Sequence, residues 1–424
     1  MISPGDATVH RIAKLARYGL LGEHPRPLAK DAVFLIVFAT LYLLSGALTV
    51  ATMDTYRMGL VSALVIPLVL LYGVRFDAVS LSFLALVAAI VLSAIYNATT
   101  LRDLVLFLRV PAFSFLMYYL SKLAMVPAKK KAILRWLLII GVVQLPVVLA
   151  QYLIVRGIDA GFGTFNFETD YALGFFEIMV LIVLLFFPKE EVPAGWKMPL
   201  AWLVTLTVFT TNAQMTKLIA LAVWLAYLIQ RPRLIRFAKV LAIGTSVALA
   251  VQLFWSIGAM VEPPAAFLWK TPIVGDVLRP KAVKGTQEPF GDYLEGGYAR
   301  VGAIRYFLSQ PLNVWGDGPS KYYDAISRQY SRGNIGHIFT YYAETGAVGL
   351  LASFVTLAAI AWMAGTRFKP SYVSSLAFLC IGLLGFTNQI MNDVAVMLVY
   401  CLVCRAQLIP TDGEPAPDLK EPTG

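Results

Sequence analysis

Residues 296–318 read GGYARVGAIRYFLSQPLNVWGDG and lie inside a long polar stretch of a chain that is otherwise built from apolar segments. This polar stretch runs from Ala259 to about Gly349 and is rich in Pro, Gly, Tyr and charged residues. Apolar segments lie on both sides of it, and His337 stands where the chain turns apolar again. We expect the rest of the chain to form a membrane scaffold that holds this polar stretch over a cavity.

The amino-acid composition places the chain among integral membrane proteins. Hydrophobic residues make up 58% of the 424 residues and charged residues only 14%, whereas a soluble domain averages about 45–50% and about 25%. The apolar segments are long enough to cross ~30 Å of hydrocarbon as helices at 1.5 Å per residue. A β-barrel would instead show alternating segments of about 10 residues. The composition therefore predicts an all-α polytopic membrane protein.

The hydropathy pattern predicts about twelve transmembrane helices. The pair at 198–211 and 214–229 is short, and the polar break between its members leaves open one long kinked helix in place of two. The expected spans are 31–50, 58–74, 77–95, 103–125, 132–154, 170–187, 198–211, 214–229, 237–258, 338–364, 371–387 and 389–404.

The distribution of Lys and Arg predicts the orientation, because cytoplasmic loops are enriched in these residues. With the N-terminus inside, short outer loops hold only Arg57, Arg102 and Arg156. If 198–229 forms two helices that each cross the membrane, the basic cluster at 231–239 lies on the cytoplasmic side. A single helix there would place this cluster outside. We therefore expect both termini in the cytoplasm and the long polar loop outside. The inner loops then carry Lys129, Lys130, Lys131, Arg135, Arg231, Arg233, Arg236, Lys239, Arg367 and Lys369.

This topology divides the chain into five regions. Residues 1–30 form a basic cytoplasmic tail, 31–258 hold helices one to nine, and 259–336 form the large outer loop. Helices ten to twelve occupy 337–405, and 406–424 form a Pro- and acid-rich cytoplasmic tail that we expect to be disordered. The sequence has no evident internal repeat, which argues against an inverted-repeat transporter.

The large outer loop carries nine basic and seven acidic residues between 259 and 336. Long loops are exempt from the charge rule, so these cations are not needed for topology. We expect two short helices, at 298–310 and 319–331, that lie as a lid on the membrane surface. Arg300 falls on the first turn of the first helix.

His337 is the first candidate for acid–base chemistry. It is the only histidine beyond residue 24, and it begins an apolar segment at the outer interface. Tyr341 and Glu344 follow four and seven residues later, on the same face of the expected helix. A lone histidine is more often structural than catalytic, but its place beside a basic loop favours a proton acceptor near pH 7.

Three charged residues lie within apolar segments near the expected outer face: Arg109, Glu177 and Lys217. Charges at such a depth usually face a cavity or pair with each other. One interpretation is a structural ion pair between Arg109 and Glu177. The other is that Arg109 and Lys217 line a pocket for an anionic group.

Three stretches together resemble the O-antigen ligase and polysaccharide polymerase superfamily of GT-C-type membrane glycosyltransferases. The resemblance covers the topology from 31 to 405 and the motifs from about 161 to 350. No single motif is specific, whereas the order, the spacing and the long penultimate outer loop together are. The stretches are Gly161-Phe162-Gly163-Thr164-Phe165-Asn166, then Thr216-Lys217-Leu218-Ile219-Ala220, then Arg300…Pro311…Gly316-Asp317-Gly318…His337…Glu344-Thr345-Gly346-Ala347-Val348-Gly349.

The resemblance implies roles for these residues. Arg300 matches the loop arginine, and His337 matches the catalytic histidine. Lys217 stands where the family has an arginine, so it keeps the charge but loses bidentate phosphate recognition. The substrate-binding residues would be Arg305, Lys217, Arg109, Glu344 and Tyr341.

The resemblance also implies a reaction in the bacterial inner membrane, at a site that faces the periplasm. The donor would be an undecaprenyl-diphosphate-linked glycan, and the acceptor either another lipid-linked repeat, in a polymerase, or the lipid A core, in a ligase. Lys217 makes polymerisation of exopolysaccharide or lipopolysaccharide repeats the favoured interpretation. A lipid-linked glycan transporter or flippase and a scaffold for envelope enzymes are the rival classes.

The implied partners are the glycan donor, its acceptor, membrane lipids and a chain-length regulator, with no nucleic acid. We expect no cofactor and no metal, because the loop lacks an Asp-x-Asp pair. Asp317 and Glu344 are too isolated in the sequence to suggest a metal site.

Overall fold

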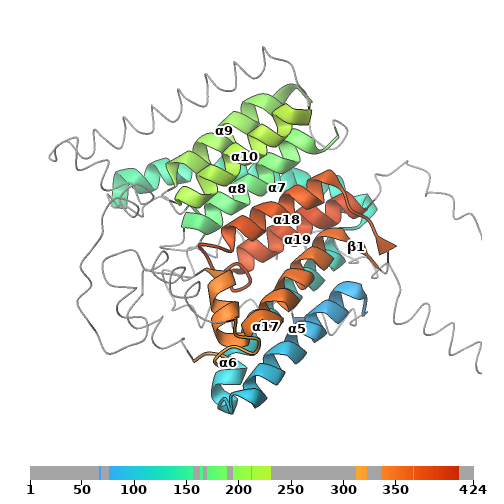
Figure 1. The fold of residues 1–424 in the computed structure, drawn as a ribbon. Helices are drawn as coiled ribbons and strands as arrows, with labels where there is room; N and C mark the ends of the chain where they lie inside the picture. The colour runs from blue at the N-terminus through green and yellow to red at the C-terminus, as the bar shows by residue number, and fades with distance from the viewer. Residues whose placement is uncertain are drawn as a thin grey trace, which may run out of the picture.

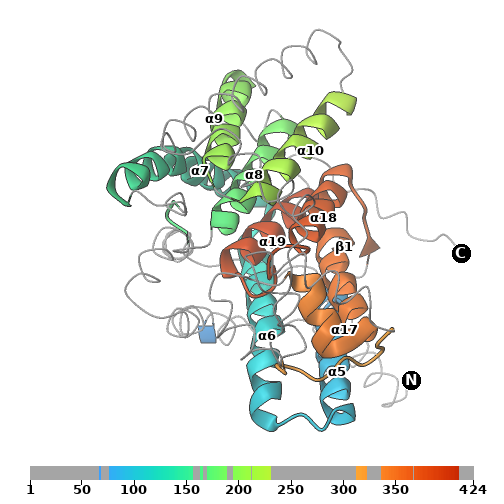
Figure 2. The same ribbon diagram turned by 60° about the vertical axis from the view of Figure 1, so that its left-hand side comes forward.

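The computed structural model describes residues 66–67, 76–155, 163–165, 170–188, 194–211, 213–230, 312–321, 336–365 and 367–409. In these ranges the chain is mostly helical. Figures 1 and 2 both show α18 and α19 between a group formed by α7, α8, α9 and α10 and a group formed by α5, α6 and α17.

The helices have the following bounds: α5 Ala78–Tyr96, α6 Leu101–Ala124, α7 Pro127–Val155, α8 Asp170–Phe186, α9 Lys197–Thr210, α10 Gln214–Gln230, α17 His337–Trp362, α18 Tyr372–Leu384 and α19 Val394–Leu408. A short 3-10 helix, η2, spans Ala194–Trp196. Strands β1 (Met363–Ala364) and β2 (Arg367–Phe368) form a small antiparallel hairpin after α17.

The described helices follow the spans expected from hydropathy closely. Residues 198–229 form two helices, because Thr211 is extended after α9 and α10 begins at Gln214. The spans expected at 31–50, 58–74 and 237–258 lie outside the described residues, except for Ile66 and Pro67, which are helical.

The largest differences from the expected boundaries are at α7 and α19. The helix expected at 389–404 begins instead at Val394, because Asp393 caps it by accepting from the backbone N–H groups of Ala395 and Val396. Ile390 and Met391 are buried in the loop before α19. Because these two residues are apolar, hydropathy predicted helix in that loop. The basic stretch expected as a loop at 126–135 is mainly the first turns of α7. Helix α19 continues to Leu408, past the boundary expected at 405.

Helix α8 lies at the centre of its group. Its side chains from Tyr171 to Leu185 are all buried. It packs against α7, α9 and α10 on its own side and against α18 and α19 on the other. This helix therefore joins its own group to α18 and α19.

Helices α5 and α17 run antiparallel in close contact. Thr356, late in α17, donates to the Ser82 carbonyl early in α5 at 3.1 Å. Ser93, late in α5, donates to the carbonyl of Glu344, early in α17, at 3.1 Å. Hydroxyl-to-carbonyl contacts of this kind let small polar residues join helices at short range.

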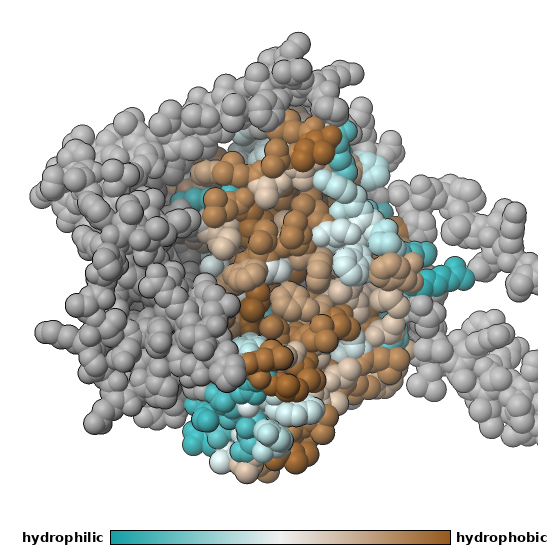
Figure 3. All heavy atoms as spheres, in the orientation of Figure 1, coloured by the Kyte–Doolittle hydropathy of each residue, from teal (hydrophilic) through white to brown (hydrophobic). Residues whose placement is uncertain are grey.

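The outward faces of several helices are apolar. On α10 the exposed large side chains are Leu218, Leu221, Leu225 and Ile229, which share one helical face. Figure 3 shows a broad brown area across the visible face, with hydrophilic residues gathered at its lower left and its right. An apolar belt between two polar rims is the surface that a lipid bilayer covers.

Among the described residues, four helices are long and apolar enough to cross a membrane, judged by length and composition: α5, α6, Pro127–Ala150 of α7, and α17. With the apolar outer surface, this makes the described structure compatible with an all-α membrane protein. Helix α17, however, is not continuous, because Gly346 within it has φ 72° and ψ −170°.

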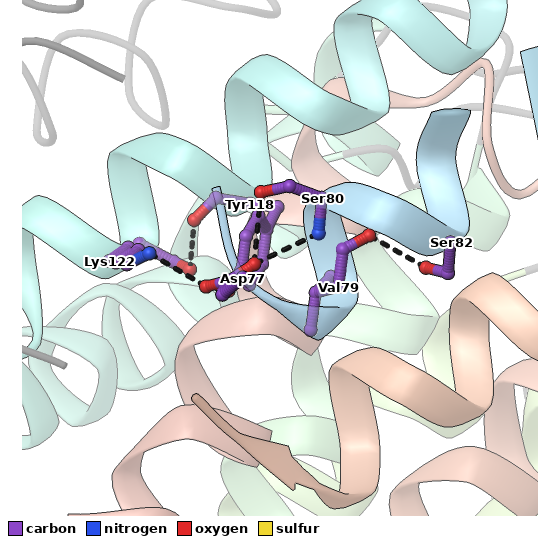
Figure 4. Close-up of polar contacts among 7 residues, drawn as sticks. Asp77, Val79, Ser80, Ser82, Tyr118 and Lys122 are labelled. Carbon is purple, nitrogen blue, oxygen red and sulfur yellow. Dashed lines mark hydrogen bonds and ion pairs between the residues drawn. The ribbon is translucent and has the colours of Figure 1, made fainter. Parts of the chain in front are cut away.

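A buried ion pair joins the start of α5 to the end of α6 (Figure 4). Lys122 Nζ lies 2.6 Å from Asp77 Oδ2, and Tyr118 donates to the same oxygen at 2.5 Å. The backbone N–H and the hydroxyl of Ser80 donate to Asp77 Oδ1, so Asp77 also caps α5. A buried charge is tolerated when it is paired and hydrogen-bonded in this way.

Candidate functional site

The candidate site is organised around the reversal of α17 at Gly346. His337 and Ser353 are 16 residues apart, yet their side chains lie 3.2 Å from each other. In a continuous helix they would be about 24 Å apart along the axis. A side chain at Gly346 would place its Cβ 2.2 Å from the Val314 carbonyl oxygen, and φ is positive there. Glycine is therefore required at the reversal.

The segment 312–321 caps both helical pieces that meet at Gly346. A helix end leaves carbonyl or N–H groups without intrahelical partners. Here the segment supplies donors to the end of the first piece and acceptors to the start of the second. The bonds are Asp317 N to Ala343 O (2.8 Å), Gly318 N to Glu344 O (3.1 Å), Ala347 N to Asn313 O (2.9 Å) and Val348 N to Val314 O (3.3 Å).

Asn313 and Glu344 fix this segment with their side chains. Asn313 Oδ1 accepts from the backbone N–H groups of Trp315 and Gly316, and its amide donates to Asp317. This Asx-type turn holds the segment in shape. Glu344, which is 2% exposed, accepts from the Ser320 backbone N–H at 2.8 Å. Glu344 is thus a structural clamp in this conformation.

The first piece of α17 carries His337 and Tyr341, and it is enclosed by its neighbours. The two rings lie 4.3 Å apart, which confirms that these residues share a helical face. Tyr341 also contacts Phe107 of α6, at 5.2 Å between ring centroids, and its hydroxyl lies 3.6 Å from the Met391 sulfur. The His337 backbone N–H donates to Asn388, in the loop between α18 and α19.

The contact between Ser353 and His337 depends on the tautomer of the imidazole ring. The Ser353 hydroxyl donates its one hydrogen to the Leu350 carbonyl at 2.7 Å. With that hydrogen placed on Leu350, the Ser353 oxygen accepts from His337 in the tautomer that carries the proton on Nε2. The lone pair then lies on Nδ1, which is the nitrogen that could accept a proton from a substrate.

The residues brought together here are buried. His337 is 1% exposed, Tyr341 2% and Glu344 2%. A general base must come within hydrogen-bond reach of the proton that it abstracts, although such contacts often form only when substrate binds. The described arrangement is therefore a closed polar cluster that would have to admit a substrate hydroxyl to Nδ1.

The other expected site residues lie on other helices or outside the described residues. Arg109 is half-buried on α6, two residues beyond Phe107, which touches Tyr341. Lys217 is half-buried on α10, which packs on α8, α9 and α18. Arg300 and Arg305, and both helices expected in the outer loop apart from residues 319–321, lie outside the described residues.

The ion pair considered between Arg109 and Glu177 is not formed. Glu177 is fully buried in α8, and neither of its carboxyl oxygens has a hydrogen-bond partner among the described residues. It faces Gly141 of α7, where an added Cβ would lie 3.1 Å from Oε2. The absence of a side chain at Gly141 makes room for this carboxyl group.

Sequence reasoning missed the residues that hold the cluster together. Asn313, Ser353 and Gln389 carry no charge and match no metal-ligand pattern, and the partners of Ser353 and Gln389 lie 16 and 49 residues away in the sequence. Only Asn313 carried a local signal, because Asn often begins a turn. Among the side chains that the structure describes, no three of the His, Cys, Asp or Glu type gather as a metal site would need.

Comparison with protein-family models finds no match for this chain, and comparison with curated proteins finds none either.

Proposed function

We propose that this protein is a membrane glycosyltransferase that uses an undecaprenyl-diphosphate-linked glycan as donor and polymerises cell-surface polysaccharide repeats. The reaction takes place at the periplasmic face of the inner membrane and needs no metal. The observation that carries the proposal is the polar cluster at the reversal of α17, where His337 Nε2 lies 3.2 Å from Ser353 Oγ. In the tautomer that carries its proton on Nε2, this imidazole can accept a proton at Nδ1.

In the proposed reaction, an acceptor hydroxyl oxygen attacks the anomeric carbon of the donor. The bond between that carbon and the phosphate oxygen breaks, and the lipid diphosphate leaves with the electron pair. His337 Nδ1 takes the hydroxyl proton. General-base help of this kind typically contributes about 10²–10⁴ in rate.

Cations are proposed to stabilise the leaving diphosphate. Negative charge builds on the phosphate oxygen during bond cleavage, and positive groups placed there lower the barrier. Arg300 is assigned this role, assisted by Arg305, Lys217 and Arg109. Tyr341 stands beside the imidazole and Glu344 holds the segment 312–321, so we assign both to substrate positioning.

The test is turnover by the purified full chain in lipid nanodiscs with a lipid-linked repeat as the donor. His337→Ala should lose most turnover while keeping expression and donor binding, and His337→Gln should fail as well, because Gln cannot accept the proton. Gln389→Ala is the matched control, since it removes a part-buried contact to Thr340 near the same cluster without removing a base. Near-wild-type turnover by His337→Ala removes the base assignment.

Three further arms examine the other parts of the proposal. Arg300→Lys should lower turnover strongly, because the single ammonium group of lysine cannot replace the two parallel hydrogen bonds that the planar guanidinium of arginine donates to a diphosphate. Activity that is lost in EDTA and restored by a divalent ion contradicts the metal-free mechanism. Transfer to lipid A core in place of a second repeat identifies a ligase.

A transporter or flippase for lipid-linked glycans is the second candidate. The break in α17 favours it, because discontinuous membrane helices often form the substrate sites of transporters. Nanodiscs have no closed interior, so product formed there can come only from catalysis. Glycan movement across proteoliposomes, without any new glycosidic bond, would favour the transporter.

A further inference from the structure

The exposed face of α5 is aliphatic almost to the end of the helix. Its exposed residues before Tyr96 recur at intervals of three and four, so they share one helical face. They are Leu81, Leu84, Ala85, Ala88, Leu92 and Ile95. A helix of 19 residues is about 28 Å long, close to the ~30 Å of hydrocarbon in a bilayer. We therefore expect lipid acyl chains to cover this face.

The aliphatic face of α5 ends at a polar turn. Tyr96, the last residue of the helix, is 70% exposed. In the turn that follows, the Asn97 amide donates to the Ser93 carbonyl at 2.9 Å, and Arg102 is exposed in the first turn of α6. Figure 2 shows this turn at the lower end of the bundle. The level of Tyr96 is therefore a boundary between apolar and polar surface.

The segment 312–321, which caps the reversal of α17, is held at the same level. Its Trp315 ring lies 6.3 Å from the Tyr96 ring, between centroids, with 33° between the ring planes. The Ser93 hydroxyl, near the end of α5, donates to the Trp315 carbonyl at 2.6 Å. Gly318 lies against the turn after α5, because an added Cβ there would be 2.7 Å from a side-chain oxygen of that turn. These contacts fix the depth of the segment relative to α5.

Large apolar side chains are exposed at this level. Leu312 and Val314 are 75% and 45% exposed, and Leu101, which begins α6 after the polar turn, is 76% exposed. Exposed apolar groups gathered in one region with a polar rim mark an interaction surface. Tyr and Trp are the side chains enriched where a bilayer meets water, because each has an apolar body and a polar tip. Tyr96 and Trp315 match this pattern.

We propose that residues 312–315 and the turn between α5 and α6 lie in the interface of a lipid bilayer. The side chains of Leu312, Val314 and Leu101 reach the boundary between head groups and acyl chains, and the two aromatic rings lie at head-group level. Continuity with the aliphatic face of α5 favours lipid over a protein partner. Because the same segment caps the break in α17, the bilayer also fixes the depth of that break. This inference does not depend on the proposed reaction.

The test measures depth with spin labels on the full chain in nanodiscs of phosphatidylcholine and phosphatidylglycerol. Single cysteines replace Leu312, Leu101, Leu84 or Lys321, and the collision rates of each label with oxygen and with a water-soluble nickel chelate are compared. Oxygen concentrates in hydrocarbon, whereas the chelate stays in water. Leu84 lies 11 residues before Ile95, or about 16 Å deeper along α5, and exposed Lys321 is the aqueous reference. The native cysteines are buried, and the chain without an added cysteine gives the background signal.

The ratio of oxygen to nickel collisions at Leu312 and at Leu101 is expected to lie between the ratios at Leu84 and at Lys321. Tyr96→Ala should shift the Leu312 ratio toward the aqueous value. Tyr372→Ala should not, because it removes another exposed tyrosine whose hydroxyl bonds to α10.

Three results would each overturn the interfacial placement. The first is a ratio at Leu312 equal to that at Lys321, which would mean that the segment lies in water. The second is a label shielded from both reagents, which would mean that protein covers the segment. The third is an unchanged Leu312 ratio in Tyr96→Ala. If the Leu312 variant does not fold, the label at Leu101 decides by the same criteria.

Discussion

His337 Nε2 lies 3.2 Å from Ser353 Oγ, although 16 residues separate the two along the chain. The contact exists because α17 reverses at Gly346 and its two pieces fold against each other. The histidine that begins the first piece is thereby enclosed inside the helix bundle. Its chemistry then depends on a serine in the second piece.

Gly346→Ala is predicted to destabilise the protein by about 1–3 kcal/mol or more. Alanine is strained at φ 72°, and its Cβ would lie 2.2 Å from the Val314 carbonyl oxygen. The measurement is unfolding in detergent. Gly382→Ala is the control, because the nearest atom to a Cβ there lies 3.8 Å away within a helix. Equal stability of the two variants would show that the reversal does not require glycine.

Ser353→Ala is predicted to lower turnover about ten-fold and to change its pH profile. The variant removes the acceptor of the Nε2 hydrogen, a bond of about 1–1.5 kcal/mol, and so frees the imidazole to change tautomer. Ser353→Thr should restore both rate and profile, because it keeps the hydroxyl group. Thr356→Ala, one turn further on, should leave the profile unchanged. An unaltered profile in Ser353→Ala would argue against the positioning role.

Breaking the ion pair between Asp77 and Lys122 is predicted to cost about 3–5 kcal/mol of stability for either single change. Asp77→Asn leaves a buried ammonium group, and Lys122→Met leaves a buried carboxylate. The double variant should recover most of the loss. A double-mutant cycle measured by unfolding tests this, with Lys131→Met as an exposed control. Additive losses would mean that the pair is not coupled.

Glu177→Met is predicted to stabilise the protein by about 1–3 kcal/mol, because it removes a buried carboxyl group that has no described hydrogen-bond partner. The comparison is Gln144→Met on α7. Gln144 is equally buried but bonds to Thr164 and to the Ile140 carbonyl, so its loss should destabilise. Loss of turnover in a stabilised Glu177→Met would reveal a functional carboxyl group, and destabilisation would contradict the prediction.

Cysteine labelling is predicted to place Lys321 outside the cell membrane and Lys131 inside. Both positions are exposed, whereas Ser320 is 9% exposed and donates its N–H to Glu344. A cysteine at 321 should react in intact spheroplasts, and one at 131 only after lysis. The native cysteines, Cys380, Cys401 and Cys404, are buried and should react little. Protection at 321 before lysis would reverse the proposed topology.

The sequence by itself determined the apolar, mainly helical character of the described part and the places of most of its helices. Hydropathy is calculated over a short window of residues. It therefore predicted the spans at 77–95, 103–125 and 170–187 to within a few residues of the observed helices. Hydropathy also predicted the break after Thr211, because polar residues interrupt the apolar segment there. The same method extended the last helix into a loop, since buried Ile390 and Met391 are as apolar as helix residues.

Only the tertiary structure decided how the candidate site is assembled. Gly346 and Gly349 look alike in the sequence, and no local pattern tells which one reverses the helix. The reversal at Gly346 is stabilised by a segment about 30 residues upstream, whose Asn313 and Asp317 bond to the two exposed helix ends. Those bonds depend on three-dimensional proximity, and they bring His337 to Ser353.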